Sequence, residues 1–438
     1  MKSKKEKDII LGAGITGLTA SYSTGFPIYE AENYPGGICA SYYIKAFSKK
    51  RLVRRYRSSE MYRFEIGGGH WIFGMDDIVS QFVNKFSRTK NYSRDAAVYF
   101  SKKKLYVPYP IQNNLRFLDE NTRKKTLKEL SDKSDRVPGT MYEWLKKNFG
   151  NTLCKLFFLP FHDLYTAGLY RKISPQDLSK SPVNYRNILK GAKKKCSPVG
   201  YNTNFAYPNN GLNHLINKIA ATCEIHYGKK VINIDVKKRE IYFKDKSIIS
   251  YNNIISTIPL NKMIKFTGIQ LKSKPDPYTS VVVLNIGATK GKTCPDEHWL
   301  YVPDSKSNFY RIGFYSNVDA SFLPRSLRKS NKNVSIYVER AYRQKKKPAK
   351  TQIKHYSNSV IKELRAMGFI EKVEVLDYTW IDVAYTWTIG GSRWREEAIE
   401  ALEEHDIYQI GRYGRWHFQG IADSIREGLN FRKQSYIS

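Results

Sequence analysis

The feature that most constrains this chain is a glycine-rich turn near its start. The run at residues 8–11 (DIIL) predicts a buried strand, and residues 18–22 (LTASY) predict a helix after the turn. Between them, Gly12, Gly14 and Gly17 form a G-x-G-x-x-G pattern. The first glycine of such a pattern makes the tight turn, the second lets the backbone approach a pyrophosphate, and the third lets helix and strand pack closely. Because the helix N-terminus offers unpaired N–H groups to phosphates, the segment predicts a dinucleotide site.

An acidic residue at the end of the next predicted strand supports this interpretation. Residues 26–30 (FPIYE) predict a strand, and the carboxylate of Glu30 can accept hydrogen bonds from both ribose hydroxyls of an adenosine. Glu30 lies 18 positions after Gly12, slightly fewer than the usual spacing of about 20, so the intervening helix should be short. A lone glycine pattern could also be an ordinary turn. The later pair Gly36 and Gly37, however, resembles the FAD signature of glutathione-reductase-like and amine-oxidase-like flavoproteins, which favours FAD over NAD.

The C-terminal region repeats the order of strand, glycine-rich turn and helix. Gly411, Arg412 and Gly414 lie in the predicted turn, and Ala422 to Leu429 form the predicted helix. In this class of flavoproteins such a segment returns to the first domain. It brings a helix N-terminus near the isoalloxazine, where the helix dipole stabilises negative charge. The segment therefore supports a flavin site, and an unrelated glycine turn is the alternative.

The composition is typical of a folded enzyme with a strongly basic surface. With 438 residues, 41% of them apolar, the chain can form two or three domains with ordinary cores. A net charge of +34 and an isoelectric point near 9.7 suggest nucleic acid or an anionic membrane as a partner. The basic runs are dispersed, however, without zinc-finger spacing or an aromatic RNA-binding signature, so nucleic-acid binding is disfavoured. Peripheral association with acidic lipid or an anionic substrate stays open. The runs are Lys2–Lys7, Lys49–Arg57, Lys193–Lys195 and Arg343–Lys350.

Cysteine usage and hydropathy favour a reducing compartment. The five cysteines are far apart, odd in number and without C-x-x-C spacing, so neither a disulfide framework nor a metal site is predicted. The N-terminus lacks the apolar segment of a secretory signal, and no uncharged apolar stretch approaches the roughly 18 residues of a membrane span. We therefore expect a cytoplasmic protein without a transmembrane segment, and the oligomeric state stays open.

Four further segments resemble one family more narrowly, in the family's order and over most of the chain. They resemble UDP-galactopyranose mutases and their relatives among the amine-oxidase-like and protoporphyrinogen-oxidase-like flavoproteins. The resemblance implies an α/β fold with an FAD-binding Rossmann-like domain, a mostly helical insert and an antiparallel-sheet substrate domain. The segments are Glu65–Gly74 (EIGGGHWIFG), Leu105–Leu115 (LYVPYPIQNNL), Phe205–Ala220 (FAYPNNGLNHLINKIA) and Trp299–Asn317 (WLYVPDSKSNFYRIGFYSN). The implied division is residues 1–80, 205–265 and 400–438 for the FAD-binding domain, 81–204 for the insert and 266–399 for the substrate domain.

Periodicity assigns secondary structure to parts of this arrangement. Residues 122–133 and 140–150 predict helices of the insert. Residues 229–259 have the strand alternation and turns of a hairpin, which the resemblance returns to the FAD-binding domain. By resemblance, the backbone at Val231 lies against the adenine.

The resemblance implies a redox-neutral reaction that nevertheless needs reduced FAD. In this family N5 of the reduced flavin attacks the anomeric carbon of a sugar nucleotide, UDP leaves, and the opened sugar recloses as a furanose. An FAD-dependent sugar-nucleotide pyranose/furanose mutase is thus implied, with a role in cell-surface polysaccharide biosynthesis. The protein's own tasks are to hold the flavin and to clamp the diphosphate.

The family's functional positions carry over to this chain one residue at a time. As catalytic residues, His70 matches the histidine beside the flavin, Arg311 the diphosphate-binding arginine, and Arg412 an arginine beside flavin and substrate. The alternatives are a capped loop histidine for His70 and, for Arg311, a strand arginine that pairs only with a carboxylate. The implied substrate-binding residues are Tyr109, Gln112, His162, Arg311, Tyr385 and Phe418, where any tyrosine could instead be routine packing. The implied FAD-binding residues are Gly12, Gly14, Ile15, Thr16, Gly17, Glu30, Ala31, Gly36, Gly37, Gly69, Val231, Gly411, Arg412, Ile421 and Ala422.

Two positions depart from the family and keep other functions open. Phe418 stands where the mutases have a tyrosine whose hydroxyl reaches the diphosphate, and His162 stands where an asparagine is common. Asp423 is expected to cap the helix that begins near it rather than to contact the flavin. An alternative is therefore an FAD-dependent oxidase or dehydrogenase of the protoporphyrinogen-oxidase or amine-oxidase type. A further alternative is a non-catalytic basic flavoprotein on acidic membranes.

Overall fold

The computed structural model describes residues 7–53, 60–131, 137–178, 181–196, 199–200, 202–343 and 347–434. Most of the basic run Lys2–Lys7 and parts of the runs Lys49–Arg57 and Arg343–Lys350 lie outside these residues. Within the described ranges, no helix combines the length and the hydropathy needed to cross a membrane.

The predicted strand, turn and helix at the start of the chain are confirmed. Strand β1 (Lys7–Leu11) is followed by helix α1 (Ile15–Thr24), and β1 pairs in parallel with β2 (Ile28–Tyr29) and with β13 (Ile248–Ser256). Apolar residues on both faces of β1 are buried, as expected for a parallel strand covered by helices on both sides.

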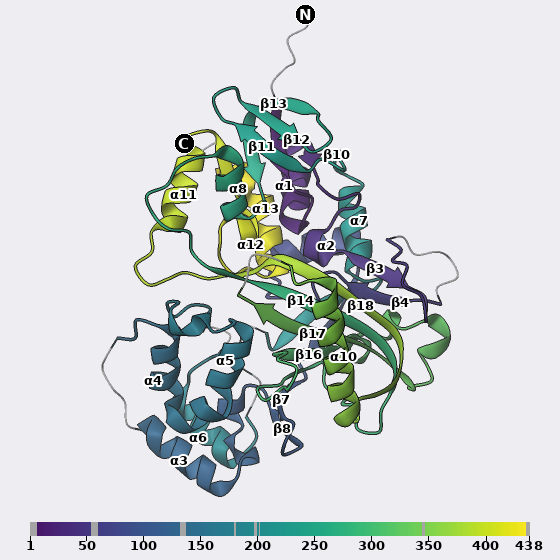
Figure 1. Ribbon diagram of the computed structural model, residues 1–438, viewed down its shortest axis with the longest axis vertical. Helices are drawn as coiled ribbons and strands as arrows, with labels where there is room; N and C mark the ends of the chain where they lie inside the picture. The colour runs from purple at the N-terminus through teal and green to yellow at the C-terminus, as the bar shows by residue number, and fades with distance from the viewer. Residues whose placement is uncertain are drawn as a thin grey trace, which may run out of the picture.

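These strands belong to a sheet with the order β10-β2-β1-β13-β12-β11, and β19 also pairs with β13. Helices α1, α7 and α13 pack together on one face, and α8 and α11 cover the other face (Figure 1). The remaining elements of this layer are β10 (Ile225–His226), β11 (Val231–Asp235), β12 (Glu240–Phe243), β19 (Ile407–Gln409), α7 (Leu212–Ala220), α8 (Leu260–Thr267), α11 (Trp394–Glu403) and α13 (Ile421–Gln434).

A second sheet has the order β18-β14-β17-β16-β15-β7-β8 and is antiparallel except where β15 pairs with β7. Helix α10 (Lys350–Ala366) covers one face through an apolar cluster, and the other face borders the main cavity (Figure 1). This confirms the predicted fold class, which combines a Rossmann-like parallel sheet with an antiparallel sheet. The strands are β7 (Ala96–Phe100), β8 (Leu105–Pro108), β14 (Tyr278–Lys290), β15 (Trp299–Tyr301), β16 (Arg311–Phe314), β17 (Asn333–Tyr342) and β18 (Ile370–Thr386).

Smaller elements connect the two sheets. Strand β3 pairs with β4, and β9 lies between β5 and β6. The short helices α9 and α12 each form about one turn. These elements are β3 (Ser41–Ile44), β4 (Tyr62–Glu65), β5 (Ile72–Phe73), β6 (Thr89–Ser93), β9 (Asn204–Pro208), α2 (Asp77–Phe86), α9 (Tyr315–Val318) and α12 (Gly411–Gly414).

Four helices lie at the lower left of Figure 1, below the parallel sheet. They are α3 (Glu120–Ser131), α4 (Met141–Leu153), α5 (Leu159–Tyr165) and α6 (Tyr185–Lys193), with a π-helical turn at Cys154–Phe158 between α4 and α5. The helices predicted at 122–133 and 140–150 correspond to α3 and α4. Thr140 and Glu143 form a reciprocal capping box at the start of α4, which accounts for its position.

The three-part division of the chain stays a prediction, but the structure refines its contents. The segment 81–204 contains the end of α2 and the strands β6 to β8 before its helices; β7 pairs with β15 of the second sheet, and β8 pairs with β7. The predicted boundary between residues 80 and 81 falls inside α2.

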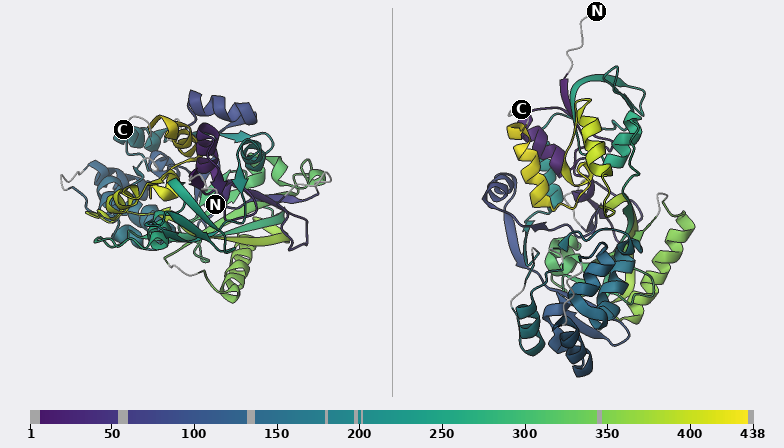
Figure 2. Two further views of the ribbon diagram at one scale, coloured as in Figure 1. Left: turned by 90° about the horizontal axis from the view of Figure 1, so that it is seen from above. Right: turned by 90° about the vertical axis from the view of Figure 1, so that its left-hand side faces the viewer.

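The two ends of the chain meet in the first layer. The segment predicted as a hairpin forms the meander β11-β12-β13, whose last strand pairs with β1. Figure 2 shows the C-terminal helix α13 beside α1. The approach is close, since a Cβ atom added at Gly428 would lie 2.0 Å from Oγ1 of Thr19. The predicted C-terminal strand, turn and helix thus complete the layer that the N-terminus begins.

Candidate active site

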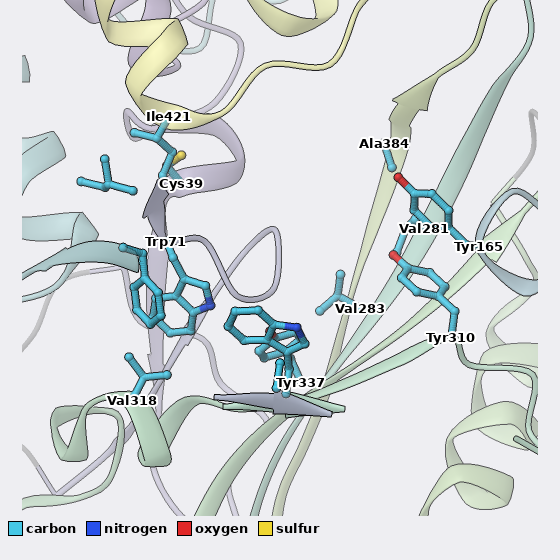
Figure 3. Close-up of a cluster of buried hydrophobic side chains, with 14 of the residues drawn as sticks. Cys39, Trp71, Tyr165, Val281, Val283, Tyr310, Val318, Tyr337, Ala384 and Ile421 are labelled. Carbon is cyan, nitrogen blue, oxygen red and sulfur yellow. The ribbon is translucent and has the colours of Figure 1, made fainter. Parts of the chain in front are cut away.

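A cavity of about 470 Å³ lies between the parallel sheet, the antiparallel sheet and the helices α4 and α5. Figure 3 shows Cys39, Trp71 and Ile421 on one side of this region and Tyr165 and Tyr310 on the other. The cavity brings together every residue predicted for the site except Gly17, Gln112 and Ala422. Segments from the start, the middle and the end of the chain therefore converge on one place.

The glycines after β1 divide into two kinds. Gly12 has a φ of +99°, and a Cβ atom there would lie 2.3 Å from Oγ1 of Thr257. A Cβ atom at Gly17 would lie 2.0 Å from the carbonyl oxygen of Gly12, so Gly17 lets α1 pack on the turn and does not line the cavity. Gly14 differs, because a Cβ atom there would meet no atom within 4 Å. Gly14 thus leaves an open cradle at the N-terminus of α1, which fits a pyrophosphate.

Glu30 and the second glycine pair complete this cradle. The two carboxylate oxygens of Glu30 accept hydrogen bonds from the backbone N–H groups of Ala13 (2.6 Å) and Glu32 (2.8 Å). Each oxygen keeps a second acceptor position for a ribose hydroxyl. Burial raises the pKa of Glu30, although these hydrogen bonds lower it. The N–H of Gly36 donates to the carbonyl of Ala13 at 2.8 Å, which holds the second loop against the first.

His70 lies in the loop after β4. A carbonyl oxygen can only accept, so the 3.1 Å contact between Nδ1 of His70 and the carbonyl of Gly68 places the ring proton on Nδ1. The other ring nitrogen, Nε2, is then an acceptor. Burial lowers the pKa of His70 to about 4, whereas the hydrogen bond to Gly68 opposes this shift. His70 is therefore neutral near pH 7.

Glu65 anchors the same loop, a function that the sequence reasoning missed. Its carboxylate accepts hydrogen bonds from the backbone N–H of His70 (3.1 Å) and the hydroxyl of Tyr207 (2.6 Å). Burial raises the pKa of Glu65 to about 7, although the Tyr207 hydroxyl and the Arg63 charge lower it. An acidic residue at the end of an otherwise buried strand, directly before a glycine run, is the signal that could have identified Glu65.

Arg311 pairs with Glu339 across neighbouring strands. The register of β16 and β17 sets the two residues directly opposite each other. Nε and Nη2 of Arg311 donate to the two oxygens of Glu339 at 2.9 and 2.7 Å. Burial lowers the pKa of Arg311, but the charge of Glu339 and the neighbouring tyrosine hydroxyls together raise that pKa well above its ordinary value. An ion pair with a carboxylate, which the alternative interpretation of Arg311 required, is thus present. Arg311 also lines the cavity, and two of its five N–H groups serve Glu339, which leaves the others for a ligand.

Arg412 has a different environment. Its Nη2 donates to the carbonyl of Ala384 at 3.0 Å, and its guanidinium carbon lies 4.8 Å from the ring centre of Phe418 and 5.1 Å from that of Tyr385. Among the described residues, no carboxylate lies within ion-pair distance of it. A half-buried cation held by carbonyls and aromatic faces can therefore accept an anionic ligand.

The other predicted substrate residues fall into two groups. Tyr109, His162, Tyr385 and Phe418 line the cavity. Nδ1 of His162 lies 2.7 Å from the carbonyl of Phe158, so Nδ1 is the protonated nitrogen there as well. Gln112 requires a correction, because its fully buried amide donates to the carbonyl of Pro182 at 2.9 Å and lies outside the cavity lining.

Three further predicted positions have structural contacts. Ala422 is buried in the first turn of α13 and does not line the cavity. Asp423 accepts a hydrogen bond from the backbone N–H of Gly420 at 3.0 Å and thus caps α13, as expected. Gly69 lines the cavity, and a Cβ atom there would lie 2.4 Å from the hydroxyl oxygen of Tyr337.

Sequence comparison assigns the chain to a family. The sequence profile described as flavin-containing amine oxidoreductase matches residues 25–298, which is more than half of the chain. The chain belongs to this family. Membership in the flavin-containing amine oxidoreductases implies FAD as the cofactor, and the open cradle at Gly14 beside the carboxylate of Glu30 fits an adenosine diphosphate group.

Several solved structures are similar to nearly the whole chain. Reduced UDP-galactopyranose mutase matches with a TM-score of 0.81 at 21% identity, covering 99% of this chain and 97% of that one. A fatty acid isomerase from P. acnes matches with a TM-score of 0.61 at 14% identity, covering 100% of both chains. Putrescine oxidase bound to putrescine matches with a TM-score of 0.58 at 12% identity, covering 99% of both. At these identities the comparisons establish the fold.

Proposed function

We propose that this protein is an FAD-dependent sugar-nucleotide pyranose/furanose mutase. The observation that carries the proposal is the presence of Arg311 and Arg412 in the same cavity as the dinucleotide cradle. Two guanidinium groups suit the two phosphates of a nucleoside diphosphate leaving group. The 0.81 TM-score to UDP-galactopyranose mutase, well above that to putrescine oxidase, agrees with this proposal.

The proposal assigns the N-terminal residues to cofactor binding. Backbone N–H groups at the start of α1 and the cradle at Gly14 would hold the pyrophosphate of FAD, and Glu30 would accept the ribose hydroxyls. Bound FAD in its reduced form supplies the nucleophile for this class of reaction. Because Arg412 has no carboxylate partner among the described residues, its charge is available to the substrate or the flavin.

The second set of residues would bind and orient the substrate. Glu339 fixes the plane of the Arg311 guanidinium, so the free N–H groups are already oriented toward a diphosphate in the cavity. Neutral His70 offers Nε2 as an acceptor for a sugar or flavin group. Tyr109 and His162 would form the wall around the base, and Tyr385 would pack against Arg412.

The first test is an isomerisation assay. Protein loaded with FAD and reduced anaerobically is incubated with UDP-galactose, UDP-N-acetylgalactosamine and other sugar nucleotides, and products are separated by chromatography. We expect an isomer of unchanged mass that forms only with reduced flavin. Absence of any isomer from flavin-loaded protein would refute the proposal.

Arg311→Lys tests the clamp without removing the charge that Glu339 needs. A lysine cannot bind Glu339 and a phosphate in the fixed planar geometry, so we expect kcat/KM to fall by about 10- to 100-fold. Arg239→Lys is the matched control, since Arg239 pairs with Asp406 at 2.8 Å and lies outside the cavity lining. Equal activity of Arg311→Lys and Arg239→Lys would show that Arg311 does not bind the substrate.

A flavin-dependent oxidase is the second candidate. Phe418 has no hydroxyl to offer a diphosphate, and Tyr165, Tyr310 and Trp387 make much of the cavity wall aromatic. This function predicts substrate-dependent oxygen consumption with a change in substrate mass. Phe418→Tyr separates the two candidates. If the protein is a mutase, the added hydroxyl should raise its affinity for the sugar nucleotide. If the protein is an oxidase, the substitution should leave its affinity for its substrate unchanged or lower it.

A further inference from the structure

A second pocket lies on the opposite side of the antiparallel sheet from the candidate active site. It lies between β17, the loop at residues 304–308 and the first turns of α10, the helix in front of the sheet in Figure 1. Neighbouring residues of β17 point to opposite faces of the sheet, so Glu339 holds Arg311 in the main cavity while Arg340 lines the second pocket. The two sites share no residue. The lining residues are Lys306, Ser307, Asn308, Arg340, Thr351, Gln352, His355, Tyr356 and Ser359.

The charges of this pocket have one sign. Arg340 and Lys306 are cations, and the described lining residues include no aspartate or glutamate. The guanidinium carbon of Arg340 lies 4.9 Å from the ring centre of Tyr342 and 5.0 Å from that of Tyr356. Among the residues that the structure describes, Arg340 makes no ion pair and its side chain donates no hydrogen bond. A guanidinium fixed by two aromatic rings, with its donors unused, is preorganised for an anion.

The N-terminus of α10 adds to this positive potential. Its N-cap residue, Ala349, has no side chain that could accept a hydrogen bond, and the first turn contains no acidic residue. Lys350 instead adds a positive charge at the positive end of the helix dipole. The side chain of Gln352 accepts a hydrogen bond from the backbone N–H of Ala349 at 2.9 Å, but α10 has neither an N-cap side-chain acceptor nor an acidic first-turn residue, and an anion in the pocket would supply the missing negative charge.

A buried hydroxyl provides an independent observation. Tyr356 is 5% exposed and lines the pocket, and its hydroxyl has no hydrogen-bond partner among the described residues. Leaving a buried hydroxyl without a partner costs free energy, which an acceptor in the pocket would recover once the atoms covering the hydroxyl move aside. Nearby Glu363 is not available for this, because it accepts hydrogen bonds from the backbone N–H groups of Lys306 (2.9 Å) and Ser307 (2.7 Å).

We propose that this pocket binds the phosphate group of a small soluble anion, with Arg340, Lys306 and the first turn of α10 as its ligands. A soluble source is favoured over a lipid headgroup because, among the lining residues that the structure describes, only Tyr356 has an extended apolar surface, and it is buried. The inference is independent of the reaction in the main cavity.

Hydrogen exchange measured with inorganic phosphate tests the site directly. We expect phosphate to protect the backbone amides in the first turns of α10 in the full-length wild-type protein. Arg340→Gln should weaken this protection, raising the phosphate concentration for half-protection by roughly tenfold or more. Lys354→Gln is the control, because this exposed residue of α10 removes the same charge outside the lining. No protection in the wild type, or an equal effect of both variants, would overturn the proposal.

Tyr356→Phe provides a second measurement that does not depend on loss of charge. Removing an unpartnered buried hydroxyl should raise the melting temperature in phosphate-free buffer and weaken phosphate protection of α10. Unchanged protection would show that the hydroxyl takes no part in the site.

Co-sedimentation with vesicles of phosphatidic acid and phosphatidylcholine tests whether the phosphate group comes from a lipid headgroup, and we expect the protein to stay in the supernatant. Sedimentation that Arg340→Gln abolishes would overturn the assignment to a soluble anion.

Discussion

Glu65 and His70 are joined by one hydrogen bond and have pKa values shifted in opposite directions. Burial lowers the pKa of His70 from 6.5 to about 4, so the neutral ring costs the folded state nothing above pH 6.5. As the pH falls from 6.5 towards 4, the unfolded chain binds the proton first and stability is lost. Burial raises the pKa of Glu65 from 4.5 to about 7, so its contribution is present below pH 4.5 and is lost as the pH rises through 7. Between pH 4.5 and 6.5, His70 and Glu65 therefore change the free energy of unfolding in opposite directions as the pH falls.

Glu65→Gln should therefore make the protein more sensitive to acid. The variant keeps an acceptor for the backbone N–H of His70 but no longer gains stability on protonation. Between pH 6.5 and 4 we expect its free energy of unfolding to fall by about 3 kcal/mol more than that of the wild type. Urea unfolding at several pH values measures this difference. Parallel pH profiles of stability for the wild type and Glu65→Gln would contradict the opposite pKa shifts of Glu65 and His70.

The glycine turn after β1 allows the fold and the cofactor site to be tested separately. Gly17→Ala should destabilise the protein without flavin, because the new Cβ atom would lie 2.0 Å from the carbonyl oxygen of Gly12. Gly14→Ala meets no atom within 4 Å and has an ordinary φ of −67°, so stability without flavin should change by less than about 0.5 kcal/mol.

Gly14→Ala should affect flavin binding much more strongly than it affects stability. A methyl group in the open cradle would displace a pyrophosphate, so purified Gly14→Ala protein should lack flavin absorbance while keeping the wild-type melting temperature of the apoprotein. Normal flavin content in this variant would place the pyrophosphate elsewhere.

The elements set by local spacing could be predicted from the sequence. The turn after β1, the strand that ends before Glu30 and the capped helix α4 each depend on residues within about 20 positions of one another. The pairing of Arg311 with Glu339 could not be predicted, because it depends on the register of β16 and β17. Gln112 was placed in the pocket wall by its motif, whereas the fold directs its amide to Pro182.

At the scale of the whole molecule, the main cavity is lined by both sheets and by the helices between them. FAD should therefore stabilise the chain as one cooperative unit. At an FAD concentration of about 100 times Kd, the free energy of unfolding should rise by about 2.7 kcal/mol. Tryptophan fluorescence reports the cavity through Trp71, Trp299 and Trp387, and circular dichroism reports the helices. We expect both transitions to shift together by several degrees; two transitions, only one of which moves with FAD, would contradict this expectation.

The packing of α13 on α1 also bears on how the protein is made. A nascent chain leaves the ribosome N-terminus first, so the turn at Gly12 emerges long before its partners at Gly411 and Ile421. The cradle stays open on one side until the segment from Gly411 to Ile421 has been translated. Cofactor loading is therefore an event that follows translation, and a chain released early by a premature stop codon would be born without the wall that retains its flavin.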